Sequence, residues 1–204
     1  MSTVAPEIRR KTPESALAAI FTSTARVAVL RVFLLDPTRA YYQRQIEAAS
    51  GHPLRAVQRE LDRLMAAGLL YRRDEGNRAY YQIDPDFPLY AELRALMLKT
   101  ASSRERLRGI AASNAAVRLC FLSADGARAL VVLGGAARPA LDALPGIEIE
   151  MLTSDEFIEA LRMNRAALDP YVRDGCDLLG RREDVIWRRI EEAGYTVRKG
   201  EGVP

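Results

Sequence analysis

The stretch from Pro53 to Ala67 constrains the fold of this chain more than any other. Apolar residues recur in it at intervals of three, four and three, which places them on one side of an α-helix: Leu54, Val57, Leu61 and Leu64. Gly68 then supplies the kind of residue that commonly ends a helix. Strand-like sequences rich in Leu, Tyr and Ile follow at 69–73 and 78–83, separated by the turn-forming residues 74–77. We therefore expect an amphipathic helix followed directly by a β-hairpin over 69–83.

Four more helices are expected around this unit. Three precede it and one follows it, because apolar residues recur at helical spacing between recognisable start and stop signals. Thr12 is expected to cap the first helix and Thr24 the second, while the others fit Tyr41–Ser50 and Phe87–Lys99. The order helix, helix, helix, glycine turn, helix, hairpin, helix predicts a winged helix-turn-helix domain over residues 13–100.

The character of the sequence changes near residues 100–104. Short apolar runs separated by Gly and Pro turns predict strands there, at Val117–Leu122, Ala129–Leu133, Ile147–Leu152 and Cys176–Leu179. Helical spacing predicts helices around these strands, at 104–112, 154–172 and 182–193. We therefore predict an α+β chain with three parts: a polar, flexible arm (1–12), the winged helix-turn-helix domain, and a small α/β domain over 104–198.

The positive charge is concentrated in the first half of the chain. The whole chain holds 30 Lys and Arg against 27 Asp and Glu, a net charge of +3. Residues 1–100 hold 15 basic and 11 acidic residues, whereas residues 101–204 hold 15 and 16. GC-rich coding explains the preference for arginine over lysine, so only the distribution of the charge along the chain is informative about a partner. The uneven distribution points to an anionic partner for the first half.

The predicted helix 53–67 suits the role of a recognition helix. A helix about 10–12 Å across fits the ~12 Å major groove of B-DNA. The face opposite the apolar stripe presents Arg55, Gln58, Arg59 and Asp62. Arginine pairs with guanine and glutamine with adenine. Its start at Pro53 directs a positive dipole end toward phosphate.

The hairpin and the preceding helix are expected to contact the DNA backbone. Arg72, Arg73 and Arg78 flank the turn that contains Asn77, and Tyr42 and Arg44 start the preceding helix. The predicted DNA-binding residues are therefore Tyr42, Arg44, Pro53, Arg55, Gln58, Arg59, Arg72, Arg73, Asn77 and Arg78. The same features also fit an ordinary solvated surface, and some winged helices serve only as protein-interaction modules, so an adaptor that touches no DNA is an alternative.

The chain contains few residues of the types that bind transition metals or act as catalytic nucleophiles and bases: one histidine and two cysteines. His52, the only histidine, sits in a Gly-His-Pro turn, which is a poor place for a Ser-His-Asp triad. Cys120 and Cys176 lie 56 positions apart, so no zinc cluster of closely spaced ligands can be written. Both cysteines lie in apolar surroundings and are expected to be buried free thiols. We expect no cofactor, no bound metal and no catalytic residue.

Several stretches of the first half carry a family resemblance: Ile20–Ser23, Val57–Leu61, Leu64–Leu70, Gly76–Tyr81 and Pro88–Leu93. Residues 17–100 resemble the ArsR-like winged-helix regulators of bacteria and archaea, and most of all the branch with a nucleotidyltransferase-like domain after the helix-turn-helix. The resemblance implies a homodimeric regulator that binds double-stranded DNA. Metal-sensing relatives use cysteine or histidine ligands, which this part of the chain lacks apart from His52. Apolar residues after the hairpin are candidates for the dimer contact or for the core: Leu89, Leu93, Leu96 and Met97.

The resemblance of the second half to a nucleotidyltransferase rests on the order of its elements. Such domains hold a triphosphate with a Gly-Ser turn and two magnesium ions with an Asp-x-Asp pair. Here the turn reads Ser123–Gly126, and the following run, Ala129–Leu133, contains no acid. We expect a catalytically silent copy used for dimerisation, for an effector or for a protein partner. A nucleotidyltransferase-like enzyme or antitoxin-type protein is the alternative, with Glu148 and Glu150 as a pair that could share a cation.

The chain lacks the signals of a membrane or secreted protein. No stretch approaches the ~18 uncharged apolar residues that span a bilayer. The first residues contain no hydrophobic core of a signal peptide. We expect a cytoplasmic protein that contacts no membrane and is associated with the nucleoid when bound to DNA.

Overall fold

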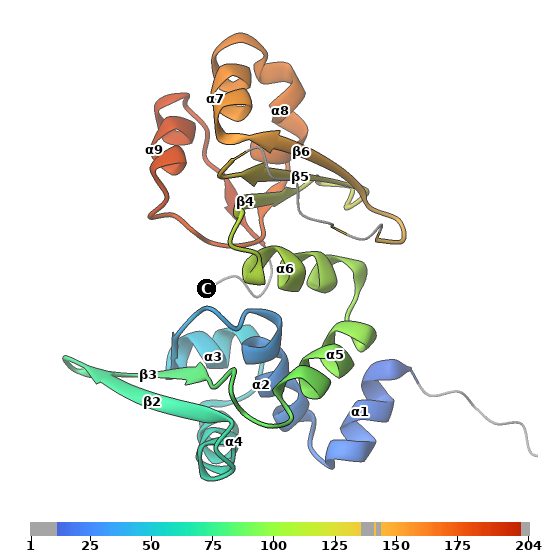
Figure 1. The fold of residues 1–204 in the computed structure, drawn as a ribbon, viewed down its shortest axis with the longest axis vertical. Coiled ribbons are helices and arrows are strands. Elements are labelled where there is room, and N and C mark those ends of the chain that lie inside the picture. The colour runs from blue at the N-terminus through green and yellow to red at the C-terminus, as the bar shows by residue number, and fades with distance from the viewer. Residues whose placement is uncertain (1–11, 136–140, 142–143, 201–204) are drawn as a thin grey trace, which may run out of the picture.

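Two groups of elements lie one above the other along the long axis of the computed structural model (Figure 1). The structure describes residues 12–135, 141 and 144–200. Apart from Thr12, the arm expected at 1–12 lies outside these residues. The first group comprises α1 (Pro13–Phe21), α2 (Thr24–Leu35), β1 (Tyr41–Tyr42), α3 (Gln43–Ser50), α4 (Leu54–Ala66), β2 (Leu70–Glu75), β3 (Arg78–Ile83) and α5 (Tyr90–Thr100). The second group begins at α6 (Ser103–Ser113), and the mixture of helices and strands confirms the expected α+β class.

The first group packs around α2 and α4. The apolar stripe expected on α4 is confirmed for three of its four residues, since Val57, Leu61 and Leu64 are buried in one core with the apolar residues of α2, whereas Leu54 is only half-buried. The side chain of Ser23, rather than Thr24, caps α2 by accepting a hydrogen bond from the backbone N–H of Arg26 at 3.1 Å. Thr24 is instead the first helical residue, because the chain preceding it is extended at Ser23.

The third predicted helix begins two residues later than expected. Tyr41 and Tyr42 form β1, which pairs antiparallel with Tyr81 and Tyr80 of β3. The ring of Tyr41 is fully buried and its hydroxyl donates to Asp36 at 2.9 Å, which holds this segment in the extended form. Burial, followed by the negative charge of Asp36, raises the pKa of the Tyr41 hydroxyl far above its ordinary value.

The helix after the hairpin also begins later than expected, at Tyr90 rather than Phe87. The cause is Pro88, because a residue that precedes proline is driven out of the helical conformation. Met97 is fully buried in the first core and Leu93 and Leu96 pack against it, whereas Leu89 is 56% exposed. Met97 therefore belongs to the core, and Leu89 is the member of the predicted dimer contact that remains accessible.

The second group is a five-stranded sheet with helices on both faces. After α6 it comprises β4 (Val117–Leu122), β5 (Arg128–Leu133), β6 (Glu148–Thr153), α7 (Ser154–Met163), α8 (Arg165–Val172), β7 (Cys176–Asp177), α9 (Val185–Glu192) and β8 (Arg198–Lys199). The strand order is β6-β5-β4-β7-β8, with β5–β6 and β7–β8 parallel and the other pairs antiparallel. Alternate residues of β4 and β5 face opposite sides. One side packs against α7, α8 and α9, and the other packs against α6, as Figure 1 shows.

Two expectations for the second group need correction, and one strand was not expected. The helix expected over 154–172 breaks at Asn164, whose φ of −142° and ψ of 59° are not helical. The strand expected over Cys176–Leu179 ends at Asp177, because the buried Asp177 carboxylate accepts hydrogen bonds from the backbone N–H groups of Leu179 and Gly180 and turns the chain. The edge strand β8 was not predicted, since it consists of only two residues.

Within the described residues, no single helix is long and apolar enough to cross a membrane. Only Ser15–Phe21 and Thr24–Leu35 taken together reach the required length and composition, and they are bent by 106° at the break between them.

Polar side chains join the two groups across α2 and α6. The Arg31 guanidinium of α2 binds the Glu105 carboxylate of α6 at 3.0 Å, and Asp36 lies 3.9 Å from Arg108. Burial disfavours the charged form of Glu105, but hydrogen bonds from Ser102 and the charge of Arg31 outweigh it, so the pKa of Glu105 lies below its ordinary value.

Replacing Glu105 with glutamine tests this contact through its pH dependence. A carboxyl whose pKa is lowered by folding stabilises the protein above its ordinary pKa and loses that contribution as the pH falls through the folded value. We expect Glu105→Gln to lower the free energy of unfolding by about 1 kcal/mol at pH 7, a value reduced for the partial exposure of the side chain. Urea titrations followed by circular dichroism should show that this difference disappears toward about pH 3. An equal difference at both pH values would contradict the assignment.

Candidate nucleic-acid interface

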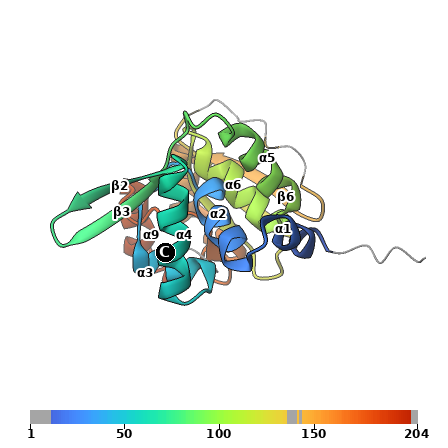
Figure 2. The same ribbon diagram turned by 90° about the horizontal axis from the view of Figure 1, so that it is seen from below.

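Among the predicted DNA-binding elements, α4 lies at the end of the molecule farthest from the second group. Figure 1 places α4 at the bottom, with the β2–β3 hairpin extending to one side. Seen from below, α4 faces the viewer and the hairpin projects beside it (Figure 2). Both elements can therefore approach one long ligand without interference from the second group.

A buried carboxylate fixes the position of α4. Glu60 is only 4% exposed, and its Oε2 accepts a hydrogen bond from Nε of Arg26, on α2, at 2.8 Å. Its Oε1 accepts from Nη1 of Arg63 at 2.8 Å and from the hydroxyl of Ser23 at 3.5 Å. The apolar-stripe argument missed Glu60, although it stands three residues after Val57, within the buried face of the helix. Since Arg26 and Ser23 belong to the start of α2, this cluster ties α4 to the core.

The three residues of the outward face of α4 that are predicted to bind DNA differ in their exposure and in their hydrogen bonds. Arg55 is exposed and makes no hydrogen bond or ion pair through its side chain with any described residue. Arg59 is exposed but bends back, and its Nε donates to the carbonyl oxygen of Arg55 at 3.3 Å. Gln58 is half-buried and donates to Oε1 of Gln43 at 3.4 Å, and Gln43 in turn donates to the Tyr81 hydroxyl at 3.1 Å. Arg55 is thus the residue of α4 that is most available to a ligand.

An acidic side chain occupies part of the N-terminus of α4. Pro53 is exposed and has the N-cap position, but it contributes no side-chain cap. The backbone N–H of Leu54 donates to Oε1 of Glu47 at 3.1 Å. The expected phosphate position at this helix end is therefore partly filled by a carboxylate of the chain itself, which the sequence argument did not include.

Five of the ten predicted residues line one groove between the start of α3 and the hairpin. The groove has a volume of about 630 Å³. Its described lining is Tyr42, Gln43, Arg44, Arg72, Asp74, Gly76, Asn77, Arg78, Ala79 and Tyr81. The Arg78 guanidinium lies 5.0 Å from the centre of the Tyr42 ring, and Tyr80 packs edge-on against the same ring at 6.0 Å. Tyr42 therefore orients Arg78 along the groove.

Two of the three hairpin arginines pair with acids of their own strand. Nη2 of Arg72 lies 2.8 Å from the Asp74 carboxylate, and Nη2 of Arg73 lies 2.8 Å from Glu75. Residues two apart on a strand share a face, so the pattern Arg-Arg-Asp-Glu already allowed these pairs to be read from the sequence. All four side chains are at least half exposed, so a polyanion can compete for the arginines. Among the described residues, Arg78 has no carboxylate partner.

The second group carries the acidic pair and the Ser123–Gly126 turn that the sequence analysis singled out. Among the described residues, no cluster of three or more His, Cys, Asp or Glu side chains is arranged to hold a metal ion. Glu148 and Glu150 are both exposed on β6, but Glu150 accepts a hydrogen bond from the Tyr171 hydroxyl at 3.2 Å. Ser123 and Asp125 bind each other in the turn after β4 at 2.5 Å.

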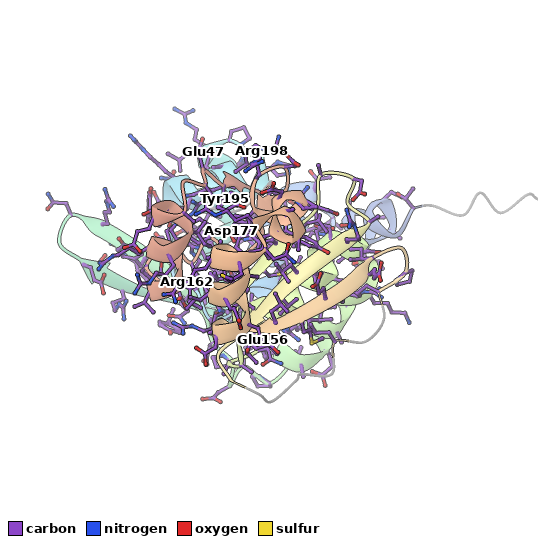
Figure 3. All side chains as sticks on the ribbon, turned by 90° about the horizontal axis from the view of Figure 1, so that it is seen from above. Glu47, Glu156, Arg162, Asp177, Tyr195 and Arg198 are labelled. Carbon is purple, nitrogen blue, oxygen red and sulfur yellow. The ribbon has the colours of Figure 1, made fainter. Side chains whose placement is uncertain are left out.

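Two buried polar groups of the second group were not predicted from the sequence. Asp177 is fully buried, and desolvation raises the pKa of its carboxyl despite hydrogen bonds from the backbone N–H groups of the following turn. The Tyr195 hydroxyl donates to Asp169 at 2.7 Å, and burial together with this bond raises the pKa of Tyr195 to about 12. Figure 3 shows both residues in the second group, seen from above. Their hydrogen bonds are to residues of the same group, so we assign them a structural role.

The two cysteines are free thiols, as expected. Cys120 is fully buried and Cys176 is half-buried. Burial raises the pKa of both thiols, and for Cys176 the charges of Arg104 and Arg198 counter part of this effect. Thiols of this kind are poor nucleophiles at neutral pH.

Comparisons with protein-family models, with curated proteins and with solved structures found no significant match to this chain.

Proposed function

We propose that residues 13–100 form a winged helix-turn-helix domain and that this protein is a sequence-specific, DNA-binding transcriptional regulator. The observation that carries the proposal is the exposed Arg55 on α4, whose side chain has no hydrogen-bond or ion-pair partner among the described residues, with the hairpin projecting beside this helix. In the proposed complex α4 lies in the major groove, where Arg55 binds a base edge. The hairpin is the wing and lies along the phosphate backbone.

The dimensions of the proposed recognition unit suit duplex DNA. With 13 residues, α4 is about 20 Å long, which spans several base pairs of a groove about 12 Å wide. Its buried face is held by the core and by Glu60, so the helix keeps one orientation toward a ligand. The groove lined by Arg44, Asn77 and Arg78 adds donors beside α4 for phosphate oxygens.

We further propose that the protein acts as a homodimer. Two copies of α4 would then read half-sites about one helical turn apart on a palindromic site. The exposed Leu89, at the start of α5, is the candidate for this contact that the first core leaves accessible. The second group, proposed as a nucleotidyltransferase-like shell without catalytic acids, then contributes to assembly or to the binding of an effector.

Recovery of bound genomic DNA tests this function. Purified protein is mixed with sheared genomic DNA at about 150 mM salt, where non-specific binding is weak, and the retained fragments are sequenced. We expect enrichment of fragments that share one motif with two related half-sites. A variant with Arg55→Ala should lose that enrichment. Recovery without any shared motif, or no recovery at all, would contradict the proposal and favour a protein-interaction adaptor.

Arg78 gives a second prediction, on the salt dependence of binding. Arg78→Ala removes a wing cation that has no carboxylate partner among the described residues, so affinity should fall for specific and random duplexes alike. The slope of log K against log salt concentration should decrease by about 1, the contribution of one phosphate contact. Fluorescence anisotropy across a salt series measures this slope. Arg162→Ala on α7, in the second group (Figure 3), is the matched control, and an equal change in both variants would contradict the wing assignment.

A further inference from the structure

A cavity lies where the first group meets α6. Its volume is about 900 Å³, within the range of small-molecule sites. Helices α1 and α2, the turn between α3 and α4, and the first turns of α6 contribute to its walls. The described lining is Thr12, Ser15, Ala18, Thr24, Val27, Ala28, Arg31, Val32, Leu35, Ala48, Ala49, Ser50, Gly51, His52, Ser102, Arg104, Glu105 and Arg108.

The lining combines apolar and cationic side chains. Helix α2 supplies Val27, Ala28, Val32 and Leu35, and the end of α3 adds two alanines. Three arginines also line the cavity, Arg31 from α2 and Arg104 and Arg108 from α6, whereas among the described lining residues Glu105 is the one acid. The Glu105 carboxylate already has partners, since it binds the Arg31 guanidinium and accepts a hydrogen bond from the backbone N–H of Ser102, the N-cap of α6. A ligand with an apolar body and a negative group would match both kinds of side chain.

Two of these arginines retain unused donors. Nε of Arg31 is buried and has no hydrogen-bond partner within the described part of the chain. Arg104 is half-buried, and the one polar contact of its guanidinium with a described residue is to the thiol of Cys176 at 3.9 Å, a weak acceptor. A buried donor without a partner is costly, and an anionic ligand would relieve that cost.

We propose that this cavity is a binding site for a small amphipathic organic anion. Its apolar body packs on Val27, Ala28 and Val32, and its anionic group binds near Arg104. Because the cavity also touches Ser50, Gly51 and His52, a bound ligand contacts the turn that leads into α4. The ligand can therefore shift the position of α4, provided that it fits one position of the turn better than another. This second step, in which the ligand is an effector of DNA binding, rests on the proposed function.

The binding step is tested with 1-anilinonaphthalene-8-sulfonate and its uncharged parent, N-phenyl-1-naphthylamine. Titration of the full chain, with direct excitation of the dye, should show one saturable site for the anion and affinity for the parent that is weaker by about tenfold or more. Arg104→Gln should remove this preference while leaving affinity for the parent unchanged. Equal affinity of the wild-type chain for both dyes would overturn the requirement for an anion.

A cavity-filling variant locates the site. Ala28→Trp places an indole in the cavity and should weaken dye binding by about tenfold or more, whereas Ala166→Trp, at an exposed position of α8, should not. Unchanged binding in the Ala28 variant would overturn the location. The wild-type comparison of the two dyes needs no variant, so the proposal remains open to refutation if the Ala28 variant fails to fold.

The coupling step has its own readout. Saturation with the anionic dye should change the affinity of the protein for duplex DNA by about threefold or more, and the Ala28→Trp variant should show no such change. Dye binding with unchanged DNA affinity would overturn the effector role alone. Dye binding by a protein that binds no DNA under any condition would leave the cavity site supported and reject the proposed function instead.

Discussion

Replacing Arg55 with alanine is expected to weaken binding to the specific DNA site by about 10- to 100-fold, the loss of one bidentate contact to a base. Binding to random duplex DNA should fall by less than about threefold, because a base contact adds little where no matching base is present. The physical basis is the position of Arg55 on the outward face of α4, where no described side chain competes for its guanidinium. Fluorescence anisotropy with both duplexes at one salt concentration measures the two effects.

A matched control separates base recognition from charge. Arg188 is an exposed arginine on α9, in the second group, so Arg188→Ala removes the same charge far from the proposed interface. This variant should bind both duplexes like the wild-type chain. Equal losses on specific and random DNA in the Arg55 variant would show that Arg55 contacts phosphate, and unchanged binding would remove it from the interface.

Leu61→Ala should lower the free energy of unfolding by about 2–5 kcal/mol, the range for deleting a buried leucine side chain. Leu61 is 1% exposed and lies in the core that α4 shares with α2. Chemical denaturation followed by circular dichroism measures the change. Ile20→Ala, at a position that is 72% exposed on α1, should change the unfolding free energy by less than about 0.5 kcal/mol.

The single tryptophan shows whether the two groups unfold separately. Trp187, on the apolar face of α9, is buried in the second group against Phe121, so its fluorescence reports that group alone. Within the described ranges, the cores of the two groups share no buried residue. We therefore expect Leu61→Ala to shift the far-ultraviolet transition while the Trp187 transition moves by less than about 0.5 kcal/mol. Equal shifts in both signals would contradict a boundary between separate domains near residues 100–104.

Much of the fold follows from patterns within a single element. The stripe of α4, the turn at Gly76 and the strand β4 were predicted closely, because helical or alternating spacing needs no knowledge of a partner. Gly76 occupies a left-handed conformation with φ of 57°, which explains why a turn sequence there is so informative. The exposure of Arg55 and Arg59 follows from the same spacing.

The remainder depends on residues far apart in the sequence. Tyr41 becomes a strand because Tyr81, forty residues later, offers a pairing edge, and no local preference indicates this. Glu60 is buried because Arg26, thirty-four residues earlier, supplies its countercharge. The hydrogen bond from the backbone N–H of Leu54 to Glu47, at the N-terminus of α4, likewise forms only when the turn between α3 and α4 is folded. Tertiary partners of this kind account for these three differences, whereas the later start of α5 after Pro88 and the turn at Asp177 have local causes.

The central claim is that α4 reads the sequence of duplex DNA, and the affinity ratio between two duplexes tests it most directly. One duplex carries the motif recovered from genomic DNA, and the other carries the same bases in scrambled order. At about 150 mM salt the protein should bind the first at least about 1,000-fold more tightly. Equal affinity for both duplexes, or no binding to either, would contradict the claim.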